Sequence, residues 1–245
     1  MKIGILQTGR SPDSLSDEHG DYDAFFKRFL AGRGFVFQTY AALDAELPSS
    51  PVDADGWLIT GSKFGVYEGH EWIAPLEAFL RACFDADVPI VGVCFGHQIL
   101  AQALGGRVEK FAGGWSVGPQ QYKSEILGDQ SLIAWHQDQV VERPEGARVL
   151  ASSEFCENAV LAYGNRAFTV QPHPEFTAQF LADLLVARGD VLPADVAAAA
   201  KEKLNSPTTS DDFADHVERF LKFRQLSGGL GNISSQVSCE KGTNE

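Results

Sequence analysis

The sequence predicts an α/β fold in which a mostly parallel central sheet is flanked by helices. Apolar runs of strand length alternate with amphipathic segments of helix length in the first part of the chain, and this alternation is typical of a parallel sheet covered on both faces. A chain of 245 residues with 44% hydrophobic residues can bury one core of ordinary size and carry an extension. Functional groups are expected where the strands of such a sheet end.

The first part of the chain supplies the alternating elements. Residues 2–7 are expected to form a buried strand, and the polar, acidic residues 8–20 a loop. A helix is expected next, because four aromatic side chains fall on one helical face of residues 22–30. The elements that follow are strands at residues 35–39 and 55–60, a helix at residues 72–84 and a strand that stops at Cys94.

The second part of the chain is richer in strands and then returns to helices. Strands are expected at residues 107–111, 118–122, 149–152, 159–163 and 167–170. Helices are expected at residues 175–188, 193–204 and 211–224. The end of the chain is rich in Gly and Ser and has few large apolar residues, so residues 226–245 are predicted to be a flexible tail.

The segment around Cys94 is the most informative part of the sequence. The spacing Gly92-x-Cys94-x-Gly96 is the thiol form of the nucleophile elbow, a sharp strand-to-helix turn that pushes one side chain out above the sheet. Glycines are needed there because a Cβ would collide with the tight backbone. The helix N-terminus favours a thiolate. Cys94 is therefore predicted to be a nucleophile; the alternative is an inert, buried core cysteine.

A second motif supplies the base that a cysteine nucleophile needs. His173 lies between Pro172 and Pro174, and Glu175 follows two positions after the histidine. Such a base takes the thiol proton and delivers it to the leaving group, and a hydrogen-bond acceptor fixes its tautomer. The two prolines stiffen the segment. His173 and Glu175 are thus predicted to complete a catalytic triad with Cys94.

Together the two motifs resemble those of the class I (triad) glutamine amidotransferase family. Val-Cys-Phe-Gly-His-Gln is followed, 79 residues after Cys94, by His-Pro-Glu, and the similarity extends over residues 1–180. The resemblance implies a flavodoxin-like α/β catalytic domain at residues 1–188, a C-terminal helical extension at residues 189–225, and the tail beyond it. The extension is expected either to cap a flank of the sheet or to serve as a lid or dimer contact.

The resemblance also implies roles for residues around the triad. The backbone amides of Phe95 and of the Gly61-Ser62 turn would form the oxyanion hole. Many family members have Gly-Gly-Pro or Gly-Pro-Gly at this turn, so the sequence leaves open which of the two amides takes part. Gly-Ser is similar instead to the free-standing GMP-synthase-glutaminase-like members and the plant γ-glutamyl peptidases. Gln98 would touch the substrate, and main-chain groups around Gly114, Trp115 and Ser116 would hold its α-amino and α-carboxylate groups.

His136 begins a His-x-Asp-x-Val segment that resembles one near the pocket of the free-standing family members. Two roles stay open for it: lining the substrate site, or a structural hydrogen bond. Trp115 likewise would either wall the glutamyl pocket or be a packed aromatic residue. His97, directly after the elbow glycine, is expected to pack against or hydrogen-bond the start of the helix.

Composition excludes several other classes of function. The chain has 33 acidic and 20 basic side chains, a net charge of −13, without a basic stripe. Nucleic acid is therefore not expected as a partner. The four cysteines lie far apart and form no Cys-x-x-Cys pair, so neither a metal site nor a disulfide is expected, and no cofactor is implied. The N-terminus is predicted to be a strand rather than a signal peptide, and no apolar run reaches membrane-spanning length, so a cytoplasmic location without membrane contact is expected.

The predicted function is cysteine-dependent hydrolysis of the γ-amide of glutamine through a γ-glutamyl thioester. If ammonia is passed on, a separate synthetase or acceptor protein is implied, because the chain has no Gly-x-x-x-x-Gly-Lys loop with which to bind ATP. One alternative is a free-standing hydrolase of another γ-glutamyl amide or peptide. The other is a non-catalytic glutamyl-binding regulator, against which the intact set of Cys94, His173 and Glu175 argues.

Overall fold

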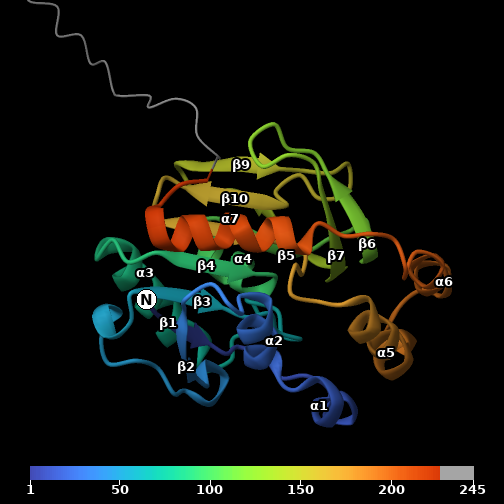
Figure 1. The fold of residues 1–245 in the computed structure, drawn as a ribbon, viewed down its shortest axis with the longest axis horizontal. Helices are drawn as coiled ribbons and strands as arrows, with labels where there is room; N and C mark the ends of the chain where they lie inside the picture. The colour runs from blue at the N-terminus through green and yellow to red at the C-terminus, as the bar shows by residue number, and fades with distance from the viewer. Residues whose placement is uncertain (227–245) are drawn as a thin grey trace, which may run out of the picture.

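A seven-stranded sheet forms the centre of the computed structural model, which describes residues 1–226 (Figure 1). Its order is β2-β1-β3-β4-β11-β10-β9. Neighbours from β2 to β11 pair in parallel, and β10 and β9 add an antiparallel edge. The bounds are β1 Lys2–Leu6, β2 Val36–Tyr40, β3 Gly56–Ile59, β4 Ile90–Val93, β9 Ala147–Ala151, β10 Val160–Tyr163 and β11 Ala167–Val170.

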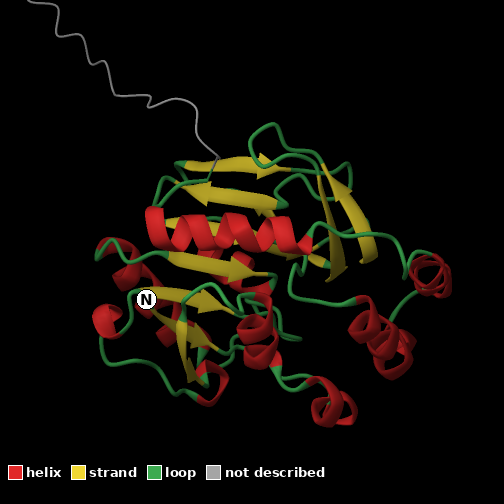
Figure 2. Cartoon of the chain, in the orientation of Figure 1, coloured by secondary structure: helices red, strands yellow, loops and turns green. Residues whose placement is uncertain are grey.

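Helices cover both faces of the sheet. On one face lie α2 (Tyr22–Phe29) and α7 (Ser210–Phe223), which cross the front of the sheet in Figure 2 and share a core with the inward residues of β1, β4 and β11. On the other face lie α3 (Ile73–Asp85) and α4 (Phe95–Ala103), which form a second core with Trp57 and the opposite side chains of the strands. The fold class predicted from the sequence is confirmed.

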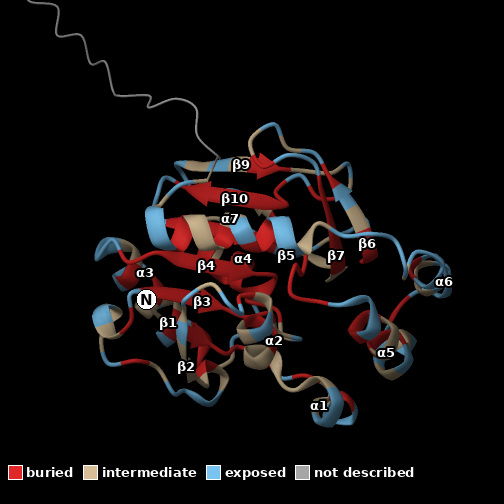
Figure 3. Cartoon of the chain, in the orientation of Figure 1, coloured by how far each residue is buried: buried red, intermediate tan, exposed pale blue. Residues whose placement is uncertain are grey.

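A smaller layer of strands and helices lies beside the carboxyl ends of the parallel strands. The antiparallel pair β6–β7 packs here with three outer helices, α1, α5 and α6, around a third apolar cluster. The second antiparallel pair, β5–β8, lies beside it and adds Val108 and Val140 to the second core. Figure 3 shows that the outer helices keep much of their surface exposed while the sheet is buried. The elements are α1 Asp13–His19, β5 Arg107–Lys110, β6 Ser116–Tyr122, β7 Gln130–His136, β8 Asp138–Glu142, α5 Ala178–Arg188 and α6 Ala194–Glu202, with short 3-10 turns η1 Ala42–Asp44, η2 Pro51–Asp53 and η3 Gly189–Val191.

One expectation about elements is wrong, and two strands were missed. Residues 8–20, expected to be a loop, contain helix α1, which buries only Leu15 and so has no apolar periodicity to reveal it. Strands β7 and β8 were not predicted from the sequence, because the short apolar run in β7 cannot be assigned to a strand or a helix by periodicity alone. The tail predicted beyond residue 226 lies outside the described residues. Among those described, no helix is both long and apolar enough to span a membrane.

Helix α7 belongs to the main core. Phe213, Val217 and Phe220 are at most 1% exposed, and the Phe213 ring stacks on Phe168 of β11 with centroids 5.4 Å apart. The helix therefore covers one face of the central sheet, as the capping alternative requires. The division of the chain at residues 188 and 225 stays a prediction.

We expect Phe220→Ala to lower the free energy of unfolding by about 3–5 kcal/mol, because it removes a fully buried aromatic side chain and leaves a cavity beside the sheet. Phe223→Ala is the matched control, since Phe223 lies on the same helix but is 64% exposed; its effect is expected within about 0.5 kcal/mol. Urea unfolding followed by circular dichroism measures both. Equal, small effects would show that α7 adds little to the stability of the sheet.

Candidate active site

Cys94 lies in the sharp turn between β4 and α4. Its backbone has φ 53° and ψ −104°, a region that residues with a Cβ rarely enter. Such a conformation costs about 1–3 kcal/mol and persists only where the surrounding structure holds it. Here the Cys94 N–H donates to the Val170 carbonyl at 2.9 Å, and the Gln98 N–H donates to the Cys94 carbonyl at 3.0 Å. The strand-to-helix turn expected from the glycine spacing is thus present.

Glycines leave the room that this turn needs. A Cβ on Gly92 would lie 2.4 Å from the Gly96 carbonyl oxygen, and one on Gly96 would lie 2.5 Å from the Ile59 carbonyl oxygen. Both obstacles are backbone atoms and cannot swing aside. A Cβ on Gly61, in the turn after β3, would lie 3.0 Å from Cε1 of His173. Backbone, strand ends and the imidazole therefore approach one another closely around Cys94.

His173 and Glu175 form a buried pair beside Cys94. The His173 N–H donates to the Ile133 carbonyl at 2.7 Å, which fixes the segment against β7. Nδ1 of His173 lies 2.7 Å from Oε1 of Glu175, and the two side chains are 6% and 2% exposed. The imidazole also stacks on Phe176, with centroids 4.0 Å apart and planes 9° apart. With Nδ1 held by the carboxylate, Nε2 is the nitrogen left for Cys94.

Charge and burial oppose each other at His173. Burial by itself lowers the pKa of the imidazole, because the charged form loses its hydration. The negative charges of Glu175 and Cys94 and their hydrogen bonds to the ring outweigh this effect and raise the pKa of His173 well above its usual range. These interactions favour the protonated form of His173.

Unpaired backbone N–H groups lie next to Cys94. Phe95 is the first residue of α4, where N–H groups have no intrahelical acceptor. Among residues 1–226, the N–H groups of Gly61 and Ser62 also donate to no backbone carbonyl. The Gly61 carbonyl accepts hydrogen bonds from the Thr8 and Thr60 hydroxyls at 3.2 and 3.0 Å. Since N–H and C=O point in opposite directions across a trans peptide, the Ser62 N–H faces away from these threonines.

A cavity of about 590 Å³ opens above Cys94. That volume lies within the usual range for small-molecule sites. Of the residues singled out from the sequence, the cavity lining includes Ser62, Cys94, Gln98, Trp115, His136 and His173. Gln98 is fixed in the floor, because its Nε2 donates to the Asp138 carbonyl at 2.9 Å and to Oε1 of Gln171 at 3.0 Å.

The other singled-out residues lie behind this lining. Glu175 stands behind His173, and Ser116 pairs with His136 in the β6–β7 ladder. Gly114 has φ +91° in the turn that leads into β6, a conformation that favours glycine. The structure therefore brings the triad, the amides and Gln98 together, whereas Gly114 and Ser116 are not part of the cavity surface.

His136 and His97 are buried and neutral. Burial, followed by the positive charge of His173, lowers the pKa of His136 to about 3. Burial, followed by the electrostatic effect of the His136 imidazole, lowers the pKa of His97 to about 3. Nδ1 of His97 lies 2.8 Å from the Thr169 hydroxyl, in agreement with the packing role expected for it. His136 is 4% exposed, and neither of its ring nitrogens has a partner among the described residues.

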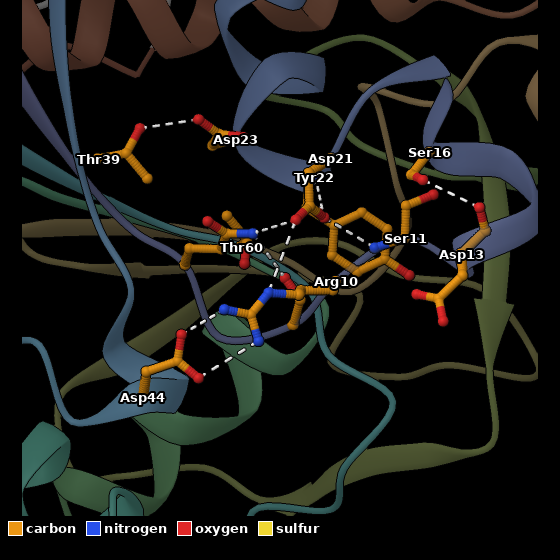
Figure 4. Close-up of polar contacts among 12 residues, drawn as sticks. Arg10, Ser11, Asp13, Ser16, Asp21, Tyr22, Asp23, Thr39, Asp44 and Thr60 are labelled. Atoms are coloured by element: carbon orange, nitrogen blue, oxygen red, sulfur yellow. Dashed lines mark hydrogen bonds and ion pairs between the residues drawn. The ribbon is translucent and has the colours of Figure 1, made fainter. Parts of the chain in front are cut away.

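The sequence did not reveal that the N-terminal loop, residues 10–13, and Tyr22 line one side of the cavity. Figure 4 shows how Asp21 organises this loop: Oδ1 accepts from the N–H groups of Ser11 and Tyr22, each at 2.8 Å, and Oδ2 from Gln7 at 2.8 Å. Ser11 and Tyr22 both line the cavity. The only available signal was Asp21 as a helix N-cap, and this signal does not say which way the next side chain points.

Comparison with known proteins identifies the family of this chain. The profile of the family described as "Glutamine amidotransferase class-I" matches residues 38–186. The chain belongs to this family. Among its relatives, γ-glutamyl peptidase 5 of Arabidopsis thaliana is 28% identical over 224 residues, 84% of this chain and 89% of the relative. A glutamine-hydrolyzing GMP synthase subunit of Halobacterium salinarum is 32% identical over 168 residues, 65% of this chain and 86% of the relative.

Solved structures of the class I amidotransferase fold resemble this chain over nearly its whole length. The crystal structure of a glutamine amido transferase from Methylobacillus flagellatus has a TM-score of 0.71 at 22% identity and covers 95% of this chain and 98% of the other. This likeness shows the fold. The family membership rests on the match of the family profile to the sequence.

We expect Glu175→Gln to lower the pKa of His173, because the variant keeps the shape of the side chain but removes the charge that stabilises the imidazolium. The ring signals of His173, followed by NMR during a pH titration, measure the shift. Glu68→Gln, which removes a carboxylate from the cavity lining away from the imidazole, is the control and should leave the titration of His173 unchanged. An unaltered titration in Glu175→Gln would contradict the assigned pairing.

Proposed function

We propose that the protein is an enzyme that hydrolyses the γ-amide bond of glutamine and related γ-glutamyl amides, with Cys94 as its nucleophile. The observation that supports this most directly is the convergence of Cys94, His173 and Glu175 at one wall of a ligand-sized cavity. Family membership and relatives named as γ-glutamyl peptidases and a glutamine-hydrolyzing synthase subunit agree with it.

The proposed reaction has two halves. The Cys94 sulfur attacks the γ-carbonyl carbon, and the resulting oxyanion is stabilised by the N–H groups of Phe95 and Ser62. The His173 imidazolium, held by Glu175, gives its proton to the amide nitrogen. The C–N bond breaks, the amine or ammonia leaves, and a γ-glutamyl thioester remains. Neutral His173 then takes a proton from water, the hydroxide breaks the thioester, and glutamate and the starting thiolate–imidazolium pair are released.

The substrate contacts belong to the same proposal. Gln98 would hold the glutamyl chain from the cavity floor, with His136 and Trp115 as further walls. Main-chain groups of Gly114 and Ser116, which lie outside the cavity surface, would help to hold the α-amino and α-carboxylate groups of the substrate. None of these steps requires a metal or an organic cofactor.

A second candidate is an ammonia-supplying protein that works with a separate synthetase. The relative from Halobacterium salinarum is named as one part of a larger synthase, which favours this role. The cavity of about 590 Å³ has the size usual for small-molecule sites, and this agrees with a self-contained hydrolase whose substrates carry a group on the γ-amide nitrogen. The intact triad disfavours a regulator that only binds glutamyl compounds.

We expect Cys94→Ala to lower the rate of glutamate release from glutamine at least about 1,000-fold, because the nucleophile is lost. Cys83→Ala is the control: the Cys83 thiol is buried on α3, burial raises its pKa to about 12, and it should retain activity. Thermal unfolding of both variants shows that the fold is kept. Turnover retained in Cys94→Ala would refute the assignment.

We expect the purified chain alone to hydrolyse γ-glutamyl compounds at a steady rate, because the triad and the oxyanion amides all come from this chain. Glutamine, a γ-glutamyl alkylamide and a γ-glutamyl amino acid, assayed side by side for glutamate, compare the possible leaving groups. Negligible turnover of all three, restored by a partner synthetase, would favour the ammonia-supplying role. No turnover and no thioester under either condition would favour the regulator.

A further inference from the structure

The cavity lining has four cationic and three acidic side chains, although the whole chain has a net charge of −13. The cationic residues of its lining are Arg10, Lys63, Lys110 and Arg188. A cation attracts an anionic ligand most strongly when it forms no ion pair with a protein carboxylate and no contact with an aromatic ring. The four residues differ in this respect.

Two of the cations have carboxylate neighbours. The Arg10 guanidinium forms an ion pair with Asp44, which Figure 4 shows beside the N-terminal loop. Lys110 lies opposite Asp138 in the β5–β8 ladder. The pKa of Glu68 is lowered mainly by its hydrogen bond to His70 and to a smaller extent by the charge of Lys110, and Lys110 also opposes the rise that burial causes in the pKa of Asp138. Lys110 therefore lies in the field of two carboxylates.

Lys63 and Arg188 form no ion pair in the part of the chain that the structure describes, and they differ in what else their charged groups contact. The Lys63 ammonium lies over the Phe64 ring, 5.3 Å from its centroid. Arg188 ends helix α5, where it lines the cavity, and within residues 1–226 no carboxylate lies within 4.0 Å of its guanidinium. Arg188 is therefore the cation most available to a ligand.

A continuous wall leads from the imidazole toward Arg188. His173 stacks on Phe176 at 4.0 Å, and the Phe176 ring lies 6.5 Å from that of Tyr22. Leu184 and Arg188, one helical turn apart on α5, complete the lining on this side. We refer to Tyr22, Phe176, Leu184 and Arg188 as the amine wall.

Tyr22 provides a neutral donor within this wall. Its hydroxyl has no hydrogen-bond partner among the described residues, although the ring is packed between Phe25 and Phe176. Burial, followed by the negative charges of Cys94 and Glu175, raises the pKa of Tyr22 well above its usual range, while Arg188 opposes the shift. The charges of Cys94 and Arg188 therefore both act on the Tyr22 hydroxyl.

We propose that the amine wall is a subsite for the leaving half of a γ-glutamyl amide, and that this half carries a carboxylate bound by Arg188 and the Tyr22 hydroxyl. The ligand class is a γ-glutamyl amino acid or short γ-glutamyl peptide. This inference rests on the proposed hydrolysis at Cys94 and names the preferred leaving group.

The chemistry of the leaving group directs it to this wall. The departing nitrogen must face His173, which gives it a proton, so whatever is attached to that nitrogen continues past the imidazole. Phe176 and Leu184 suit the carbon atoms next to the nitrogen, and the planar guanidinium suits a carboxylate, which it binds through two parallel hydrogen bonds. Glutamine has only an NH₂ at this position and leaves the wall empty.

Three substrates isolate the effect of the carboxylate. γ-Glutamylglycine and γ-glutamylglycinamide have nearly the same shape, but only the first has a charged leaving group; glutamine has neither. In the wild-type protein we expect kcat/KM to be higher for γ-glutamylglycine than for the glycinamide. In Arg188→Gln we expect kcat/KM for γ-glutamylglycine to fall about 10- to 100-fold, and the other two substrates to change less than about twofold. Added salt should reduce the wild-type preference, because Arg188 is exposed to solvent and ions screen exposed charges.

Arg143→Gln is the matched control, since it removes the same charge from an exposed arginine after β8 that does not line the cavity. It should leave all three substrates unchanged. An equal loss for all three substrates in Arg188→Gln would overturn the inference, because Arg188 would then bind the α-carboxylate common to them. A selective loss in Lys110→Gln instead of Arg188→Gln would also overturn it.

The failure of this inference is separable from that of the proposed function. If glutamine and both glycine compounds are hydrolysed through Cys94 at similar rates, the hydrolase stands and the amine wall does not select a carboxylate. If none of the three is hydrolysed, the proposed function and the subsite both fall.

Discussion

The candidate site depends on the parallel pairing of β4 with β11. These strands are neighbours in the sheet, with Val93 opposite Val170, although a long stretch of chain separates them. The hydrogen bond from Cys94 N–H to Val170 holds the nucleophile turn to the end of β11, and His173 follows three residues later. The pairing register therefore sets how far the imidazole lies from the sulfur. A shift by one residue would turn the side chains to the other face of the sheet.

Burial then determines which groups in the site are charged. An isolated ion is unfavourable in so dry a place, and the structure meets that constraint in two ways. Glu175 and Cys94 raise the pKa of His173 against the effect of burial, whereas burial, followed by the charge of a neighbouring histidine, lowers the pKa values of His136 and His97. Of these three buried histidines, His173 is thus the only one whose pKa is raised.

The cavity is assembled from parts of the chain that are far apart in sequence. The N-terminal loop, organised by Asp21, brings Tyr22 to one side, and the end of α5 brings Arg188 beside it. The β5–β8 and β6–β7 pairs close the opposite side. The central sheet and its covering helices position Cys94 and His173, whereas these peripheral segments supply much of the cavity lining. In the proposed reaction, this part of the lining would face the leaving group.

The sequence by itself determined the parallel α/β class, the turn at Cys94 and the pairing of His173 with Glu175, because each is encoded locally: strand and helix periods, glycines where a Cβ cannot fit, and a carboxylate two residues from its histidine. It did not reveal α1, β7 or β8, whose short segments have no distinctive period. Tyr22 was expected only as part of an apolar helix face, and Arg188 only as a helix end. Their place beside the cavity was decided by tertiary packing, since the direction of a side chain across a cavity depends on contacts between distant segments that no local pattern records.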